Sequence, residues 1–396
     1  MAAVVVVAHV AALGFPLGNL DPIVDATFHE QAEAILDGGL PYSDRDYEYP
    51  PLSLPLVLGP GLISDSEPSY RSAFGWEMLT FDAAIVLMLA FGLSPRRRLV
   101  WGALGVWSVG MIGLSDLGPL PDSDIDGEPL GLARFDLAPA ALVLGAALAR
   151  ERVRSALWSF LLSTAVAVKF FPVFLYPSFL RDEPEPRRVA AAAIAPLALA
   201  AAIVLLTGDD FGRAVSYHTG RELQIETLGA TPFMLAHLLG ADASTELGAG
   251  GWNLVAGGAE VARALSIGLF FGAWILVAIE GWRRRVPPLR IATAILAVMV
   301  LFAPVLSPQF LFWVLPVSAA AYGLRLPNLL LIATVLLTQL MLSLYTGVSN
   351  LGDSFVLAVA ARNLALTAFT VAAVAYAFRE PEPEPEPEPQ AQPAPA

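Results

Sequence analysis

The chain has 396 residues, is 56% hydrophobic and only 15% charged, and carries a net charge of −13. A soluble protein would carry about 25% charged residues, so the composition argues against a soluble protein and predicts one that lies in a membrane. The absence of cysteine excludes disulfides, thiol nucleophiles and cysteine-ligated metals, and four scattered histidines make a zinc site unexpected. No cofactor and no nucleic-acid partner are expected.

Apolar stretches of about 18 residues or more, each long enough to cross a bilayer, recur along the chain. The first predicted helix, near residues 2–16, lacks a basic start and a clear cleavage site, so we expect a retained helix and not a signal peptide. Further membrane helices are predicted near residues 71–93, 99–115, 130–149, 188–206, 256–280, 288–304, 305–322, 327–345 and 354–378. The predicted fold class is an all-α polytopic membrane protein with about ten transmembrane helices.

Arginine clusters set the predicted orientation, because loops rich in arginine stay in the cytoplasm. The clusters lie at residues 96–98, 150–154, 181–188 and 283–290. The acidic, arginine-poor loops should face outward, near residues 17–50, 116–128, 208–252 and 347–353. Both termini of this multi-pass cell-membrane protein are then cytoplasmic. Residues 1–379 are predicted to form one domain, and the Glu-Pro repeat of residues 380–396 a disordered tail.

Two segments do not fit as simple spans. Residues 51–63 are short and contain Pro55 and Pro60. Residues 155–180 lie between two arginine clusters, so both ends should be cytoplasmic, yet the segment is too short to cross twice. We predict a re-entrant hairpin with Lys169 near its tip, since non-helical backbone at membrane depth must be packed in protein or line a wet cavity.

The first outer loop contains two candidate catalytic carboxylates. Asp21 precedes Pro22, the usual pairing at a helix start, so capping is its simplest role. Asp25 lies one turn into a predicted helix of residues 22–37, with His29 four residues later. A solvated acid favoured by the helix dipole and a functional carboxylate are both open interpretations of Asp25.

The second half of this loop, GGLPYSDRDYEYPPL, is both acidic and aromatic. A loop of this kind at a membrane surface can hold a sugar, or it can simply be solvated. Its candidate sugar or acceptor ligands are Tyr42, Asp46, Glu48 and Tyr49. A metal ion among Asp44, Asp46 and Glu48 is possible, but none is predicted.

Lys169 is the only lysine of the chain and lies in the apolar stretch STAVAVKFFPVFLYP. An ionisable residue at membrane depth is costly and indicates a function by default, although a lysine can also extend its ammonium to an interface. Because lysine binds phosphate as a compact point charge, Lys169 is a candidate phosphate ligand.

Three further segments carry polar candidates. Arg134 begins a span at its outer end, within an Arg-Phe-Asp triplet that could also be an interfacial ion pair. Arg221 suits bidentate phosphate recognition, and its loop could equally be an ordinary polar loop. The remaining candidate sugar or acceptor ligands are His218, Gln224 and Glu226 in that loop, and Gln309 in a Ser-Pro-Gln segment that could be a simple turn.

Taken in order, these segments resemble the GT-C class of glycosyltransferases that depend on polyprenyl-phosphate sugars. The closest resemblance is to glycosyltransferase family 87, which contains mannosyltransferases that use polyprenyl-phosphate mannose. The matching segments are the Asp25 loop and residues 38–52, 133–140, 168–172, 217–227 and 305–313. The resemblance implies a GT-C-like bundle with short re-entrant or juxtamembrane helices, whose outer loops form the active site. Some relatives have tyrosine at the position of His29 and histidine at that of Gln309.

The resemblance also implies a reaction. Asp25, with Asp21 as runner-up, would act as general base on an acceptor hydroxyl, which attacks the anomeric carbon with inversion. The donor would be a hexose, by family habit mannose, on a polyprenyl or dolichyl phosphate. Lys169 and Arg221, with Arg134 behind them, would stabilise the leaving phosphate. The acceptor could be a glycolipid, a glycan or a protein, and membrane lipids surround the enzyme.

Other classes of protein compete with this interpretation. A secondary transporter or lipid-linked-sugar flippase would also have proline-broken helices and a charge at the midplane, but the sequence has no obvious internal repeat and its acids concentrate in one outer loop. A polymerase or ligase that moves a whole lipid-linked glycan would share the architecture, and the sequence does not separate it. A non-catalytic scaffold would leave the depth of Lys169 without a reason.

Overall fold

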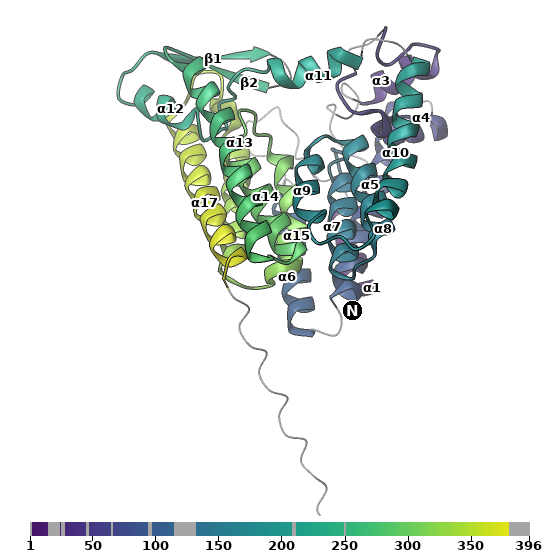
Figure 1. Ribbon diagram of the computed structural model, residues 1–396. Helices are drawn as coiled ribbons and strands as arrows, with labels where there is room; N and C mark the ends of the chain where they lie inside the picture. Colours follow the sequence, from purple (N-terminus) through teal and green to yellow (C-terminus); the bar gives the residue numbers. More distant parts are fainter. Residues whose placement is uncertain are drawn as a thin grey trace, which may run out of the picture.

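The computed structural model describes residues 2–14, 24, 28–44, 47–64, 66–93, 97–114, 132–207, 211–248 and 251–379 (Figure 1). Three predicted site residues, Asp21, Asp25 and Asp46, and the tail from residue 380 lie outside the described residues. The described chain forms a helical bundle. The N-terminal end of its first helix, α1 (Ala2–Gly14), and the C-terminal end of its last, α17 (Asp353–Ala377), lie at the same end of the bundle (Figure 1).

Five helices are long and apolar enough to cross a membrane: α5 (Glu67–Gly92), α10 (Pro186–Thr207), α13 (Ala259–Arg284), α16 (Leu326–Ser343) and α17. All five coincide with spans predicted from the sequence. At 1.5 Å per residue, even the 18 residues of α16 extend about 27 Å, close to the ~30 Å hydrocarbon core. Only 11% of the apolar stretch of α10 or α13 is buried in the protein, so these two helices present most of their surface to lipid.

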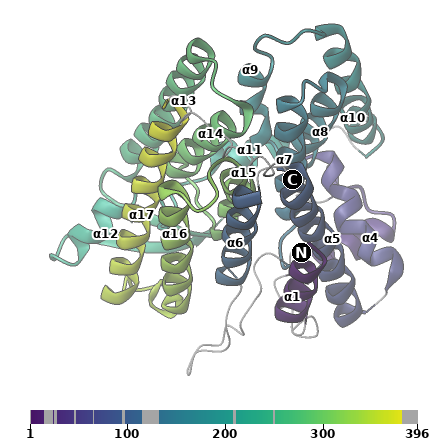
Figure 2. The same cartoon turned by 90° about the horizontal axis from the view of Figure 1, so that it is seen from below.

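The other five predicted spans are also helices, but shorter ones: α1, α6 (Arg97–Gly113), α7 (Leu137–Glu151), α14 (Pro288–Phe302) and α15 (Leu311–Tyr322). The positions of the helices are therefore confirmed, whereas ten full crossings are not. α14 and α15 lie between the other helices (Figure 2), and nearly all of their residues are buried. Because protein surrounds these two helices, their lengths need not match the bilayer.

The segment 155–180 turns back on itself, as predicted. It consists of α8 (Ser155–Val168), the 3-10 helix η4 (Phe171–Leu175) and α9 (Tyr176–Phe179), with Lys169 in extended backbone at the turn. The two ends of the hairpin meet, because the Glu183 carboxylate accepts hydrogen bonds from Ser155 Oγ and from Trp158 Nε1. The turn of the hairpin buries most of the Lys169 side chain, which is 14% exposed.

The end of the bundle away from the N-terminus carries four short helices and a β-hairpin (Figure 1). The helices are α3 (Glu30–Leu36), α4 (Leu54–Ile63), α11 (Phe211–Gly220) and α12 (Thr231–His237), and the antiparallel hairpin consists of β1 (Ala243–Gly248) and β2 (Gly251–Ala256). Three short 3-10 helices, η3 (Pro51–Ser53), η5 (Pro308–Phe310) and η6 (Tyr345–Gly347), complete the described chain. The all-α prediction is wrong for the β-hairpin. Its six-residue strands are largely polar or small, so no alternation of apolar residues marked them in the sequence.

Candidate active site

Lys169 lies in a cage of aromatic rings and one carboxylate. Its ammonium pairs with Asp136 Oδ1 at 2.6 Å, and its side chain is 14% exposed. The ring centroids of Tyr49, Phe135, Phe310 and Trp313 lie 5.2–5.8 Å from Nζ. Ring faces attract a cation at such distances, so the carboxylate and the rings together offset the cost of an ammonium at this depth.

Asp136 is a member of this cage that sequence analysis did not select. It directly precedes α7, is 3% exposed, and accepts a second hydrogen bond on Oδ1 from Trp313 Nε1 at 2.5 Å. The Trp313 ring is itself stacked between Phe171 and Phe310, with centroids 4.1 and 4.0 Å away. The ion pair of Asp136 is therefore formed with Lys169 of the hairpin.

The first outer loop packs on one side of the cage. The Tyr42 hydroxyl donates a hydrogen bond to the Tyr49 carbonyl at 2.7 Å, and the Tyr49 ring meets Phe135 edge-on at 4.7 Å. Phe28 is buried and lies 6.2 Å from Tyr49 and 5.6 Å from Phe135, centroid to centroid. Tyr42 therefore shapes the loop, while Tyr49 and Phe28 contact the ring walls of the cage.

The helix α11 lies across the end of the bundle opposite the N-terminus (Figure 1) and contacts this loop. His218 Nε2 donates a hydrogen bond to the Glu48 carbonyl at 2.9 Å. The His218 ring also lies 5.7 Å from Phe170, which is the residue after Lys169. Near the start of α11, Phe211 meets Tyr42 edge-on at 5.3 Å. These contacts bring together the segments around residues 48, 170 and 218. The sequence identified each of these segments but not their contacts.

The Glu48 carboxylate lies among phenol and cationic groups. Burial raises the pKa of Tyr49 and of Tyr217, and Glu48, which hydrogen-bonds both hydroxyls, raises it further. Partial desolvation lowers the pKa of His218. The charges of Lys169 and Arg221 lower this pKa further, whereas Glu48 raises it. Both cations therefore lie close enough to act on one imidazole, which favours its neutral form at pH 7.

The lowered pKa of His218 predicts how the stability of the fold changes with pH. Because the pKa of His218 is lower in the folded protein than the ~6.5 of an unfolded chain, the unfolded state binds more protons as the pH falls through that value, and the fold loses stability. We expect the melting temperature of His218→Gln to fall less steeply than that of wild type between about pH 7 and 5. Parallel thermal melts would check this, and identical slopes would contradict it.

Arg221 has unused hydrogen-bonding capacity. Its guanidinium lies 5.2 Å from the centre of the Tyr217 ring, and its buried Nε and Nη2 atoms find no partner among the described residues. Buried donors are rarely left unpaired, so an acceptor from outside the chain suits this position. Arg134 donates to the Ala133 carbonyl at 3.1 Å, and its charge lowers the pKa of Tyr49, which places it beside the same cluster.

Two other predicted ligands are engaged within the protein. Gln224 is 2% exposed and its Oε1 accepts the backbone N–H of Leu306 at 3.0 Å, which holds the segment before η5. Glu226 is 4% exposed and its Oε1 accepts the Tyr345 hydroxyl at 2.5 Å. Their part in sugar binding stays a prediction, which these contacts do not favour. Gln309 lies in η5 beside Phe310, whose ring faces Lys169.

A comparison with protein families finds a match that covers most of the chain. The sequence model of glycosyltransferase family 87 matches residues 47–308, about two thirds of the chain. This stretch contains the described cations Arg134, Lys169 and Arg221 together with Glu48 and Asp136. No curated protein matches the chain.

Proposed function

This chain belongs to glycosyltransferase family 87 and is a membrane glycosyltransferase, and on that premise we propose that it transfers mannose from a polyprenyl phosphate to a hydroxyl of an acceptor. The reaction inverts the anomeric carbon and takes place at the outer face of the membrane. The acceptor hydroxyl loses its proton and forms the new glycosidic bond, while the bond from the sugar to phosphate oxygen breaks. The other product is the polyprenyl phosphate.

The observation that carries this proposal is the gathering of charges around Lys169. Among the described residues of this cluster, three cations, Arg134, Lys169 and Arg221, outnumber two carboxylates, Glu48 and Asp136, by one charge. Such an excess favours the phosphate of a lipid-linked sugar and the charge that develops on it as the bond breaks. Arg221 is the leading phosphate ligand, because two of its buried donors have no partner among the described residues, whereas Lys169 is already paired with Asp136.

We assign the general base to Asp25, with Asp21 as the alternative. Asp25 lies outside the described residues, and the support comes from its neighbours along the chain. Val24 is fully buried, and Phe28 contacts Tyr49 and Phe135, two of the rings that face Lys169. A carboxylate in this segment is therefore suited to a hydroxyl bound beside the cage, provided that it comes within hydrogen-bond reach.

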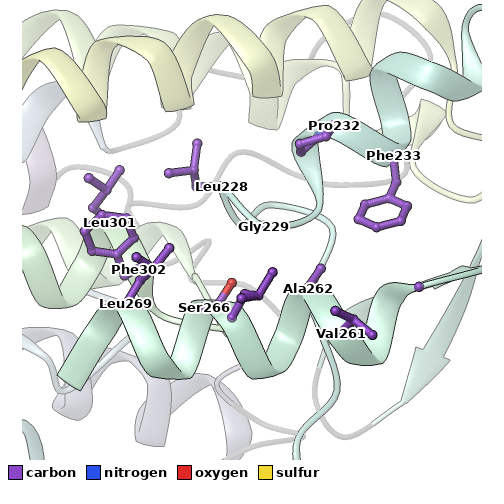
Figure 3. A pocket seen from close by; sticks show the side chains of 12 residues that line it. Leu228, Gly229, Pro232, Phe233, Val261, Ala262, Ser266, Leu269, Leu301 and Phe302 are labelled. Carbon is purple, nitrogen blue, oxygen red and sulfur yellow. The ribbon is translucent and has the colours of Figure 1, made fainter. Parts of the chain in front are cut away.

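An apolar cavity suits the lipid tail of the donor. It has a volume of about 600 Å³ and lies between α12, α13 and the outer end of α14, with Ser266 as its one polar side chain (Figure 3). A drug-sized pocket has about 300–1,000 Å³, so the volume accommodates several isoprene units. Its wall includes Leu228 and Gly229, which follow Arg221 in the same loop, so a tail in the cavity is compatible with a phosphate at Arg221.

Filling this cavity should weaken binding of the tail without slowing the chemical step. We expect Ala262→Phe to raise KM for a long-chain donor about tenfold and to leave kcat unchanged. The larger side chain would displace part of the lipid tail, and the loss of two buried CH₂ groups costs about 1.6 kcal/mol. Leu276→Phe is the matched control on the same helix, since Leu276 is 69% exposed to the surroundings and lies outside the cavity. A KM for Ala262→Phe equal to that of the control would contradict a tail in this cavity.

Donor choice tests the proposed function itself. The purified protein, supplied with a lipid extract from its host, should incorporate radiolabel from polyprenyl-phosphate mannose into a new product. It should not incorporate label from a nucleotide-linked mannose. Incorporation from the nucleotide sugar alone would contradict the proposed donor, and preferential transfer from polyprenyl-phosphate glucose would change the sugar.

A further inference from the structure

Outside this site, three helices meet at a buried group of polar side chains. His9 of α1 is hydrogen-bonded through Nδ1 to Asp82 Oδ2 of α5 at 2.9 Å, and through Nε2 to Ser108 Oγ of α6 at 2.8 Å. Trp107 of α6 donates its Nε1–H to the other carboxylate oxygen, Asp82 Oδ1, at 2.7 Å. His9 and Asp82 are 2% and 1% exposed, so both are shielded from water and lipid.

The buried position of Asp82 indicates that its polar contacts have a role. It lies near the middle of α5, about 15 Å from the C-terminal end of the helix at 1.5 Å per residue. A carboxylate at such depth is costly and indicates a function by default. The packing of α1 explains why such a carboxylate is needed. Val4 and Val7, on the face of α1 turned away from the bundle, are 70% and 66% exposed, so apolar contacts alone define the rotation of this helix poorly. Directional hydrogen bonds from His9 fix both its rotation and its depth.

The same group is connected to the Lys169 cage. The buried Trp107 ring meets Phe312 of α15 at 6.3 Å. The next residue, Trp313, donates to Asp136, which pairs with Lys169. α6 and α15 are also packed closely, since a Cβ at Gly110 would lie 2.5 Å from Leu315 Cδ2. A shift of Trp107 would therefore be passed to the wall of the cage.

We propose that His9 and Asp82 are positioning residues that lock α1 and α6 onto α5 inside the membrane. The lock holds two parts of the site in register. Through His9 it sets the position of α1, the helix that precedes the first loop, and through Trp107 it sets the N-terminal end of α15. Its effect on rate rests on the transferase function proposed above, whereas the lock itself can be measured without any substrate.

The first test measures the position of α1 directly. Because the chain has no cysteine, spin labels can be attached through V7C and W76C, at positions that are 66% and 50% exposed. Pulsed EPR in lipid nanodiscs should give one narrow distance between α1 and α5 in the otherwise unchanged protein. H9A and D82L should broaden or shift this distance. An unchanged narrow distance in both variants would overturn the lock.

Two further variants separate the lock from a general loss of packing or charge. D82N can keep all three hydrogen bonds, because its amide can donate to His9 Nδ1 while His9 donates from Nε2 to Ser108, so it should keep the narrow distance. T338V is the matched control, since in the described part of the chain the buried Thr338 hydroxyl bonds to the Thr334 carbonyl of its own helix alone, at 2.7 Å. A distance that broadens equally in T338V would overturn a specific role for His9 and Asp82.

The second test measures transfer. A displacement of about 1 Å at a reacting centre costs about 100-fold in rate, so we expect D82L to lower kcat by about that factor with the KM for the donor unchanged. D82N should keep most of the wild-type kcat. A kcat for D82N as low as that of D82L would overturn the lock and point to the charge itself. If wild type shows no transfer, the proposed function fails, and the EPR distances still decide the lock.

Discussion

Asp25→Asn is expected to lower kcat by about 10²–10⁴-fold, the usual contribution of a general base, with little change in the KM for the donor. The amide has the shape of the carboxylate but cannot accept the proton of the acceptor hydroxyl. Initial rates with radiolabelled polyprenyl-phosphate mannose would measure the effect. An elution profile and melting temperature like those of wild type would show that the variant is folded.

Asp21→Asn is the matched control for this prediction, because it makes the same change in the same loop. We expect it to keep most of the wild-type rate, since a helix cap tolerates asparagine as well as aspartate. A loss in Asp21→Asn with full activity in Asp25→Asn would move the base to Asp21. Full activity in both variants would exclude both aspartates as the general base.

Lys169→Met is the second change with a large expected effect. Removing a cation beside the leaving phosphate should lower kcat by about 10²–10³-fold, as does loss of a donor to a developing oxyanion. The same change leaves the Asp136 carboxylate buried without its cation, which destabilises a fold by about 3–5 kcal/mol. A low rate in this variant alone would therefore not separate catalysis from folding.

The double variant Lys169→Met with Asp136→Asn separates the two effects. It removes both charges together, and the asparagine carbonyl can still accept the Trp313 N–H that Asp136 accepts now. We expect it to recover the melting temperature of wild type but not its kcat. Recovery of transfer would assign Lys169 to folding only and leave Arg221 as the phosphate ligand.

The helices and the turn at Lys169 could be predicted from the sequence, because each depends on a local stretch of chain. An apolar run of bilayer length selects a helix wherever it occurs, and the arginine clusters on both sides of residues 155–180 required the chain to turn back there. The structure bears out both expectations. Ten full crossings are not confirmed, because only five of the described helices are long and apolar enough to span a bilayer, and α14 and α15 are buried in protein.

Contacts between distant segments could not be predicted in the same way. Asp136 and Lys169 are separated by 33 positions, and His9 and Asp82 by 73, so only the packing of the helices shows that they are partners. Gln224 looked like a ligand because it is polar and lies in an outer loop, yet its side chain holds the backbone of Leu306. A polar residue in a loop does not reveal from its sequence whether it faces the substrate or the protein.

Reconstituted vesicles give the most direct test of the central claim that this cluster belongs to a glycosyltransferase and not to a flippase. Proteoliposomes would contain radiolabelled polyprenyl-phosphate mannose and the lipid extract of the host. The donor and its products would be separated over time, and the leaflet of the intact donor would be followed in the same vesicles. We predict that labelled product and free polyprenyl phosphate appear in equal amounts with wild type, and not with Asp25→Asn. Movement of an intact donor between leaflets, without product, would contradict the account.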